Sequence, residues 1–392
     1  MPDLPVYMDN HATTRVDPRV VEAMMPYFTT TYGNAGSVSH RFGWDAAAAV
    51  DSARERIAAA IGAEAREIVF TSGATESNNL ALKGALPQLA RKGKHVVSAI
   101  SEHKAVLDPL KRLAREGWDV TFVPCDATGY VSAEVIEAAL RPDTVLVSVM
   151  AANNEVGTIN PVRQIGLICR DRGIVFHTDA TQAVGKVPID VNDDAVDLLS
   201  LSAHKIYGPK GIGALYVRRR DPQVRLTPIF DGGGHERGMR SGTLAVPLIV
   251  ALAKAVEIMG QESEAENARI LTLRERLHTS IGARVESIQL NGHPTLRLPG
   301  NLNLSFGYVD GEALMMAMRE VAVSSGSACS SAEPDPSHVL LAMGLDDDMA
   351  RASLRFGLGR FTTAEEVDFT VDAVSQAVAR LRPMSAAWSS RP

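Results

Sequence analysis

The sequence predicts an α/β protein: a large domain on a mainly parallel sheet, followed by a smaller α+β domain. Short β-rich apolar runs alternate with helical stretches through the first half of the chain, which indicates βαβ units and a sheet covered on both faces. A long helical region from about residue 248 to 277 then leads to a second pattern of strands and helices. A chain of 392 residues is long enough for both domains.

The large domain is predicted to hold seven strands. The apolar runs that predict them are Ile68–Phe70, His95–Ser98, Val120–Val123, Val145–Val149, Ile174–His177, Leu198–Leu201 and Gly213–Val217. Helical spacing between some of these runs, at 105–116 and 134–140, supports parallel crossovers. Ligands of such sheets bind at the carboxyl ends of the strands.

The smaller domain is predicted from a strand at 301–306 and a last helix after Thr362. Valines and a leucine recur along that helix at a spacing that forms one apolar stripe. They are Val367, Val371, Val374, Val378 and Leu381. Thr362 and Glu365 have the spacing of a capping box at its start. We expect residues 15–262 to form the large domain, and residues 1–14 and 263–392 to form the small one.

Composition excludes several classes of protein. The formal net charge is −6 and charged residues make up 22%, without the basic excess that nucleic-acid binding favours. No apolar run approaches the roughly 20 residues of a membrane helix. The N-terminal residues lack the pattern of a signal peptide. We therefore expect a cytoplasmic protein that binds neither nucleic acid nor membrane.

Two strand ends carry residues suited to one cofactor. Asp179 follows the run 174–177, and Lys205 follows the run 198–201 in the segment Ser202-Ala203-His204-Lys205. A lysine can hold an aldehyde as a Schiff base, and an aspartate can keep a pyridine nitrogen protonated. Pyridoxal phosphate needs both, because its protonated ring acts as an electron sink. The pair alone is suggestive of that cofactor.

A phosphate site is predicted where the strand 68–70 runs through Thr71-Ser72-Gly73-Ala74-Thr75 into a helix. Backbone N–H groups and the positive dipole end of a helix can bind an anion there. The spacing fits neither the P-loop nor the dinucleotide fingerprint. Taken alone, the turn is better interpreted as the start of an ordinary Ser/Thr-capped helix.

One of the three cysteines is placed to react. Cys169 lies in an apolar helical run and Cys125 follows a strand, so both read as structural residues. Cys329 lies in the stretch 323–336, which is rich in small residues and has no apolar period, so we expect an exposed and mobile loop there. No C-x-x-C pair suggests zinc, and we expect no resident metal. Cys329 is therefore the candidate nucleophile.

Together these motifs make the chain resemble the group I cysteine desulfurases, which are pyridoxal phosphate enzymes of fold type I in the class V aminotransferase family. The resemblance runs from Val6 to the helix that begins near Thr363. It is carried by six motifs in the family's order: Thr71–Ser77, Glu102–Lys104, Asn153–Glu155, His204–Gly211, Gly234–Thr243 and the Cys329 loop.

The resemblance implies the roles of the cofactor-binding residues. Lys205 would form the Schiff base and move the substrate's Cα proton, Asp179 would pair with the ring nitrogen, and Gln182 would bond the ring's phenolate oxygen. His103 would stack on the ring and shuttle protons; a solvated loop histidine is the alternative. The remaining implied contacts, mostly to the phosphate, come from Ala74, Thr75, Asn154, Ser202, His204 and, from the other subunit of a homodimer, Thr243.

The resemblance also implies the reaction. Arg355, helped by Asn154, would clamp the carboxylate of L-cysteine, although a structural ion pair is a serious alternative for Arg355. Cys329 would take the sulfur as a persulfide, leave alanine, and pass the sulfur to acceptors, chiefly an iron–sulfur scaffold protein on which it could transiently contact a cluster. Selenocysteine as substrate, a dedicated pathway such as tRNA thiolation, or a catalytically silent scaffold partner are the other readings.

Overall fold

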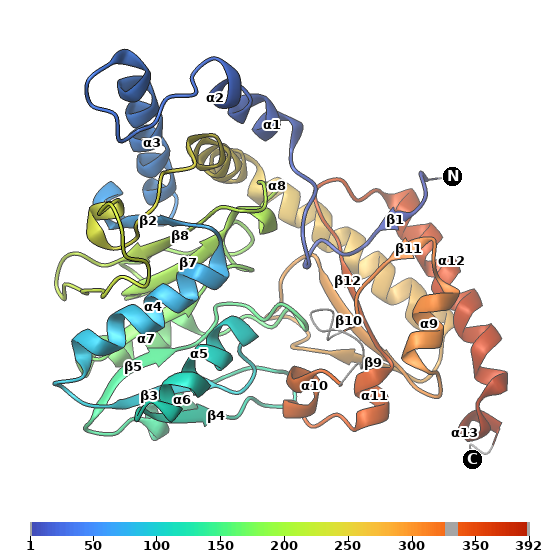
Figure 1. The fold of residues 1–392 in the computed structure, drawn as a ribbon. Coiled ribbons are helices and arrows are strands. Elements are labelled where there is room, and N and C mark those ends of the chain that lie inside the picture. Colours follow the sequence, from blue (N-terminus) through green and yellow to red (C-terminus); the bar gives the residue numbers. More distant parts are fainter. Residues whose placement is uncertain (1, 326–335, 390–392) are drawn as a thin grey trace.

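The large domain is built on one seven-stranded sheet. In the computed structural model, which describes residues 2–325 and 336–389, the strand order is β2-β8-β7-β6-β5-β3-β4. The strands are β2 Ile68–Thr71, β3 His95–Ala99, β4 Asp119–Val123, β5 Thr144–Ser148, β6 Val175–Asp179, β7 Leu198–Ser202 and β8 Gly213–Val217. Only β8 runs antiparallel to its neighbours β2 and β7. The predicted fold class and all seven predicted runs are confirmed (Figure 1).

Helices cover both faces of this sheet, because successive strand residues point to opposite sides and are apolar on both. Val69, Val96 and Leu146 pack with α4 (Ala74–Leu89) and α5 (Lys104–Arg115). Their sequence neighbours face the other side, where they form a core with α3 (Arg41–Ala59), α7 (Val162–Asp171) and the first half of α8 (Val246–Arg284). Except for the edge strand β4, the strands are therefore buried along their whole length, and the polar residues at their carboxyl ends are left for chemistry.

A second core lies beside the first. The antiparallel sheet β12-β10-β9 is formed by β9 Ile288–Asn291, β10 Asn301–Phe306 and β12 Ser353–Gly357. The second half of α8 and α12 (Ala364–Leu381) pack with it. The chain's first strand, β1 (Val6–Tyr7), joins this region by pairing in parallel with β11 (Val321–Ala322). Figure 1 shows α8 running from the large sheet to this smaller region.

The other helices are short connections and covers. They are α1 Pro18–Met24, α2 Pro26–Thr29, α6 Ala133–Ala139, α9 Gly311–Ala317, α10 His338–Ala342, α11 Asp347–Arg351 and α13 Ala386–Ser389. Among the described residues, none of the helices is long and apolar enough to cross a bilayer.

The start of α12 corrects one prediction. The capping box is formed by Thr363, whose hydroxyl accepts from the backbone of Glu366, and by Glu366, whose carboxylate accepts from the backbone of Thr363. The expected pair Thr362 and Glu365 has the same spacing one residue earlier. Thr362 is used differently, since its hydroxyl accepts a hydrogen bond from the Gly359 N–H at 2.9 Å and closes the turn that precedes the helix. The apolar stripe of α12 is buried as predicted, except that Leu381 is only partly covered.

Candidate active site

Asp179 is the last residue of β6, and its carboxylate is buried and oriented by two donors. Its Oδ2 accepts from Asn78 Nδ2 at 2.6 Å, and its Oδ1 accepts from the Thr181 N–H at 3.0 Å. Asn78 comes from α4, on the other side of the strand end, and is fully buried. Charge-assisted bonds of this kind fix a carboxylate in place.

Lys205 ends a single 3-10 turn, Ala203–Lys205, that follows β7 directly. Because β6 and β7 are parallel neighbours, Asp179 and this turn lie at the same edge of the sheet. The Lys205 Nζ donates to the backbone oxygens of His11 and Ala12, each at 2.6 Å. The N-terminal segment therefore lies across the carboxyl edge of the large sheet and holds the lysine amine.

The anion cradle lies between β2 and α4. Gly73 caps the helix with φ of +148°, a backbone conformation that favours glycine, and Ala74 and Thr75 are the first two helical residues. Their N–H groups have no acceptor within the helix, so they are free to bind an anion. A Cβ built on Gly73 would lie 3.9 Å from the Ser202 hydroxyl, so the end of β7 faces the cradle.

His204 lies between the cradle and the N-terminal segment. Its Nδ1 lies 3.2 Å from the Thr13 hydroxyl, and its backbone oxygen accepts from the backbone N–H of Thr14. Burial, aided by the nearby positive charge of Lys205, lowers the pKa of His204 to about 4. The imidazole is therefore neutral near pH 7, and it can offer one N–H donor to an anion.

His103 stands at the N-terminus of α5, where its Nδ1 accepts from the Ala105 N–H at 3.0 Å. This bond leaves the proton of the neutral ring on Nε2. Burial lowers the pKa of His103, opposed by the negative charge of Asp179 and aided by the positive charge of Lys205. His103 thus lies within electrostatic reach of both residues, and it is not the solvated loop histidine considered as the alternative.

Arg355 comes from β12 of the smaller sheet and reaches the edge of the site. Its Nη1 donates to the backbone oxygen of Asn154 at 2.9 Å, and its Nη2 pairs with Asp9 Oδ1 at 3.0 Å. The expected structural ion pair is therefore present. The buried Nε of Arg355 has no acceptor among the described residues, so the edge of the guanidinium that carries Nε can still bind a carboxylate.

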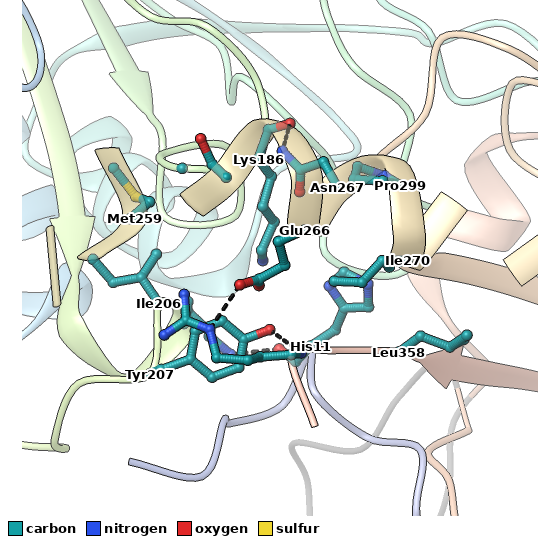
Figure 2. A pocket seen from close by; sticks show the side chains of 15 residues that line it. His11, Lys186, Ile206, Tyr207, Met259, Glu266, Asn267, Ile270, Pro299 and Leu358 are labelled. Carbon is teal, nitrogen blue, oxygen red and sulfur yellow. Dashed lines mark hydrogen bonds and ion pairs between the residues drawn. The ribbon is translucent and has the colours of Figure 1, made fainter. Parts of the chain in front are cut away.

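A small pocket lies next to the site, and Lys205 is one of the residues that line it. It encloses about 30 Å³, and Figure 2 shows Lys186, Glu266 and His11 pointing into it from three segments. Gln182 bonds two of the lining residues: its Oε1 lies 3.1 Å from both His11 Nδ1 and Lys186 Nζ, and its Nε2 donates to the His11 oxygen at 3.0 Å. Beyond it, Glu266 pairs with Arg360 at 2.7 Å.

The segment that carries Thr243 is anchored to the cradle, although Thr243 itself is exposed. Glu236 and Arg237 both have positive φ, and Glu236 is held by a buried bidentate pair with Arg54 at 2.6 and 2.7 Å. Further along, Arg240 pairs with Glu76 of α4 at 2.8 Å, while Glu76 also accepts from the Ser72 N–H. Thr243 thus follows a fixed segment but makes no contact with the site of its own chain that the structure records.

Cys329 lies outside the described residues, and so does the loop conformation expected for it. The structural roles expected for the other two cysteines fit the structure, since Cys169 is buried in the large core and Cys125 packs against it. Burial raises the pKa of both thiols, which makes them poor nucleophiles.

The residues at the strand ends fit pyridoxal phosphate. The group needs an amine, an anion next to a ring nitrogen, and a phosphate cradle, and the chain places Lys205, Asp179 and the Gly73 turn on adjoining segments of one sheet edge. Buried polar atoms without partners among the described residues lie at the same edge, as expected for a site that a ligand completes. They are Asn78 Oδ1, His11 Nε2, Thr178 Oγ1 and Thr181 Oγ1.

Sequence reasoning missed Asn78, His11 and Lys186, which orient the residues it found. Asn78 had a usable signal, since it lies one helical turn after Ala74 on the helix that leaves the cradle. His11 had none, because its contacts depend on how the N-terminal segment returns to the sheet edge. Lys186 lies four residues after Gln182, so its local spacing was a weak signal.

Comparison with known proteins places these features in a family. The profile of the aminotransferase class-V family matches residues 6–369. A protein of Anaeromyxobacter dehalogenans named cysteine desulfurase IscS is 58% identical over 382 residues, which are 97% of this chain and 94% of that protein. A solved NifS-like protein superposes with a TM-score of 0.89 at 37% identity, covering 96% of this chain and 100% of its own. The structure of SspA in complex with cysteine superposes with a TM-score of 0.80 at 39% identity, covering 91% and 99%.

Proposed function

The chain belongs to the aminotransferase class-V family and, within it, to the pyridoxal phosphate-dependent cysteine desulfurases, and from this premise we propose that it converts L-cysteine to L-alanine and delivers the sulfur for iron–sulfur cluster assembly. The observation that carries the proposal is the placement of Lys205 and Asp179 beyond the ends of neighbouring parallel strands, each held by hydrogen bonds.

Each residue of this edge has a defined task. Bound here, pyridoxal phosphate supplies an electron sink for the bond that breaks at the substrate's Cα. Asp179, fixed by Asn78, would pair with the ring nitrogen of the bound group, and Lys205 would hold its aldehyde carbon and serve as the base for the substrate's Cα proton. His103, with its Nε2–H proton, would stack on the ring of the bound group and could assist that proton transfer.

The phosphate is held by the N–H groups of Ala74 and Thr75, the Thr75 and Ser202 hydroxyls, and neutral His204. Helix N-termini favour anions through their unpaired donors and their dipole. A single chain provides this helix N-terminus, at the start of α4. Thr243 completes it from the partner subunit, since in its own chain it is exposed. The cofactor is therefore bound across the interface of a homodimer.

An exposed apolar surface supports that homodimer. Five large side chains on α1–α3 and the segment between them are about half exposed or more. They are Met25, Phe28, Tyr32, Phe42 and Trp44. A cluster of this kind is unusual on a monomer and typical of an interface.

The substrate is L-cysteine, as in the complex of the related SspA. Arg355 binds its carboxylate through the unpaired Nε and one Nη, with Asn154 beside it, while Asp9 keeps the guanidinium in place. The Cys329 thiolate attacks the substrate sulfur, the substrate's C–S bond breaks, and the electrons of that bond remain with the carbon, which takes up a proton to become alanine. Cys329 is left as a persulfide, which an acceptor thiol removes.

The domain division and the location complete the proposal. The two apolar cores support a large domain of residues 15–262 and a small domain of residues 1–14 and 263–392, since α8 changes from one core to the other between Met259 and Ile270. The two cysteines that the structure describes are free thiols, which supports a reducing compartment such as the cytoplasm.

The test is the visible spectrum of the purified protein before and after addition of L-cysteine and a reductant, with sulfide and alanine measured together. We expect a yellow protein that releases sulfide and alanine in equal amounts. Cys329→Ser should keep the colour and lose sulfide release. A yellow protein that acts only on selenocysteine would show that selenocysteine, and not cysteine, is the substrate. A colourless protein would refute the proposal.

A further inference from the structure

We propose that Lys186 is a positioning residue which, together with His11, fixes the side-chain amide of Gln182 with its N–H donor beside Lys205. The inference deepens the proposed function, because it explains how this chain presents a donor to the cofactor's ring oxygen. It rests on contacts among described residues of three segments: the turn after β6, the N-terminal segment and the turn after β7.

The amide orientation follows from the chemistry of its two neighbours. Burial lowers the pKa of Lys186 to about 7, so its ammonium form is present at neutral and lower pH. In that form the group has donors and no acceptor, and the Gln182 atom 3.1 Å from Lys186 Nζ is the oxygen. The Gln182 nitrogen, on the other side, lies 3.0 Å from the His11 backbone oxygen, which can only accept. Both contacts demand the same orientation, and the reversed amide would lose both.

His11, in the N-terminal segment, supports the same orientation of the Gln182 amide. Its Nδ1 lies 3.1 Å from the same Gln182 oxygen, so Nδ1 must carry the proton. Burial, aided by the charges of Lys186, Arg355 and Lys205, lowers the pKa of His11 well below its ordinary value, so the ring is neutral. One oxygen of Gln182 therefore receives two donors from two separate segments of the chain.

The Gln182 side-chain nitrogen and the Lys205 amine donate to the same atom. The His11 backbone oxygen accepts from Gln182 Nε2 at 3.0 Å and from Lys205 Nζ at 2.6 Å. The two nitrogens are thus neighbours around one oxygen, and the amide has a second N–H with no acceptor among the residues described. In pyridoxal phosphate the ring oxygen is next to the carbon that carries the aldehyde, so a group bonded to Lys205 brings that oxygen toward this N–H.

The surroundings of Lys186 leave it available for this task. Its aliphatic chain lines the pocket with Met259 and Ile270, and its own backbone oxygen accepts from Asn267 Nδ2 at 3.2 Å. Glu266 faces the pocket but is paired with Arg360, and among the described residues Lys186 forms no ion pair (Figure 2). Gln182 is the hydrogen-bond acceptor that the structure gives to the ammonium group.

Two variants test this role in the cofactor-loaded enzyme. Lys186→Met keeps most of the side chain's length and removes its donors, so the Gln182 amide can turn and the ammonium's charge is lost. We expect kcat/KM for L-cysteine to fall about tenfold, the value of one lost hydrogen bond. The pH midpoint of the cofactor's visible absorption should rise, because a turned Gln182 amide no longer donates to the ring oxygen, and a hydrogen bond to that negative oxygen opposes protonation of the cofactor. Lys186→Arg, which keeps a cationic donor, should restore most of both properties.

A double-mutant cycle with Gln182→Ala separates positioning from general stability. If Lys186 acts through Gln182, then Lys186→Met should change neither the absorption midpoint nor kcat/KM by more than twofold when Gln182 is already alanine. Lys254→Met, which removes an ammonium that pairs with Glu257 on the surface of α8, is the matched control and should leave both unchanged.

The outcomes are distinct. Unchanged midpoints in Lys186→Met, or equal effects with and without Gln182, would overturn the positioning role while the wild-type protein still desulfurates cysteine. If Lys186→Met does not fold, the same cycle is run with Lys186→Gln, which has no charge and a shorter reach. A wild-type protein without cofactor or activity would instead refute the proposed function itself.

Discussion

His177 is a residue whose buried, neutral state should make stability depend on pH. It lies under the active-site edge in β6, between the hydroxyls of Ser148 at 2.8 Å and Ser200 at 3.1 Å. Burial lowers its pKa to about 4. Between about pH 6.5 and pH 4 the unfolded chain therefore binds a proton that the folded chain does not, so the free energy of unfolding falls as the pH falls.

We expect this histidine to account for a loss on the order of 3 kcal/mol between pH 7 and pH 4, as an upper value. Urea unfolding of the wild type and of His177→Gln at a series of pH values measures it. The variant should be less stable at pH 7 but show a shallower decline, while His204 contributes equally to both proteins. Parallel curves would show that His177 is not the titrating group.

Asn78 is the residue on which the orientation of Asp179 depends most directly. Removing its amide in Asn78→Ala deprives the Asp179 carboxylate of its 2.6 Å partner. A hydrogen bond to a charged group is worth about 1.5–3 kcal/mol, so we expect the desulfurase rate to fall roughly 10- to 100-fold. Steady-state sulfide release measures it. Asn79→Ala is the control, since that side chain is partly exposed and bonds only Thr75 of its own helix.

Residues that end strands were the predictable part of the site. Lys205 and Asp179 stand where a buried apolar run stops, and the parallel arrangement brings such ends together. The contacts of the side chains that orient them were harder to predict. Asn78 lies on the helix that leaves the predicted cradle, but its contact with Asp179 joins segments 101 residues apart. His11 reaches this edge only because the N-terminal segment returns to the sheet, which leaves no local spacing to read. Arg355 shows the intermediate case: its strand follows from the chain, but its partner Asp9 does not.

At the level of the element, the start of α12 offers a direct test of a corrected boundary. Thr363→Ala should lower the free energy of unfolding by about 1 kcal/mol, because the hydroxyl that caps the Glu366 N–H is lost. Glu365→Ala should change it by less than about 0.5 kcal/mol, since Glu365 takes no part in the capping box. Chemical denaturation distinguishes them. Equal losses in the two variants would favour the boundary one residue earlier.

A second test at the level of elements concerns the contact between α4 and the segment that carries Thr243. Arg240 and Glu76 are mostly buried, with side chains 20% and 7% exposed. Because this pair fixes the segment against the cradle, we expect Arg240→Gln and Glu76→Gln each to weaken cofactor binding, and the double variant to be little worse than either. A coupling energy of about 0.5–3 kcal/mol in the cofactor's dissociation constant is expected.

The surface pair Arg112–Glu116 is the control for that cycle. Its side chains are 64% and 51% exposed and lie on α5, so its coupling energy in cofactor binding should be close to zero. A similar value for both pairs would mean that Arg240 and Glu76 do not act on the cradle.

Whole elements were predicted more closely than their ends. Buried apolar runs identified all seven strands of the large sheet within about two residues, because covered strands have few polar residues inside them. Helix α8 extends seven residues beyond the predicted end at 277, since its last turns are mostly polar and exposed and carry little periodic signal. The cap of α12 was misplaced because two adjacent threonines each have an acidic residue three positions later.

For the whole molecule, the proposed contribution of Thr243 to the partner's site can be tested by mixing two inactive variants. Lys205→Ala lacks the reactive amine and Thr243→Ala weakens the phosphate site. If Thr243 crosses the interface, a mixed dimer contains one site with both defects and one site with neither. Random reassociation of an equal mixture makes about half of the dimers mixed, and each of these has one intact site of two. We therefore expect about a quarter of the wild-type sites to be recovered, measured by cofactor absorbance and sulfide release. Failure to recover any would place Thr243 in its own subunit's site.

The pairing of β1 with β11 sets the order in which a newly made chain can mature. The segment that holds the Lys205 amine, His11 and Ala12, is synthesised within the first dozen residues, but the strand against which its neighbour β1 pairs begins at Val321. At about 5–20 residues per second, roughly 15 to 60 seconds of translation separate the two. The large sheet can form during that interval, whereas the N-terminal segment that covers its carboxyl edge is anchored only once β11 has been made. A nascent chain that ends before Val321 should therefore carry the sheet without the β1–β11 pairing that anchors the segment holding the Lys205 amine.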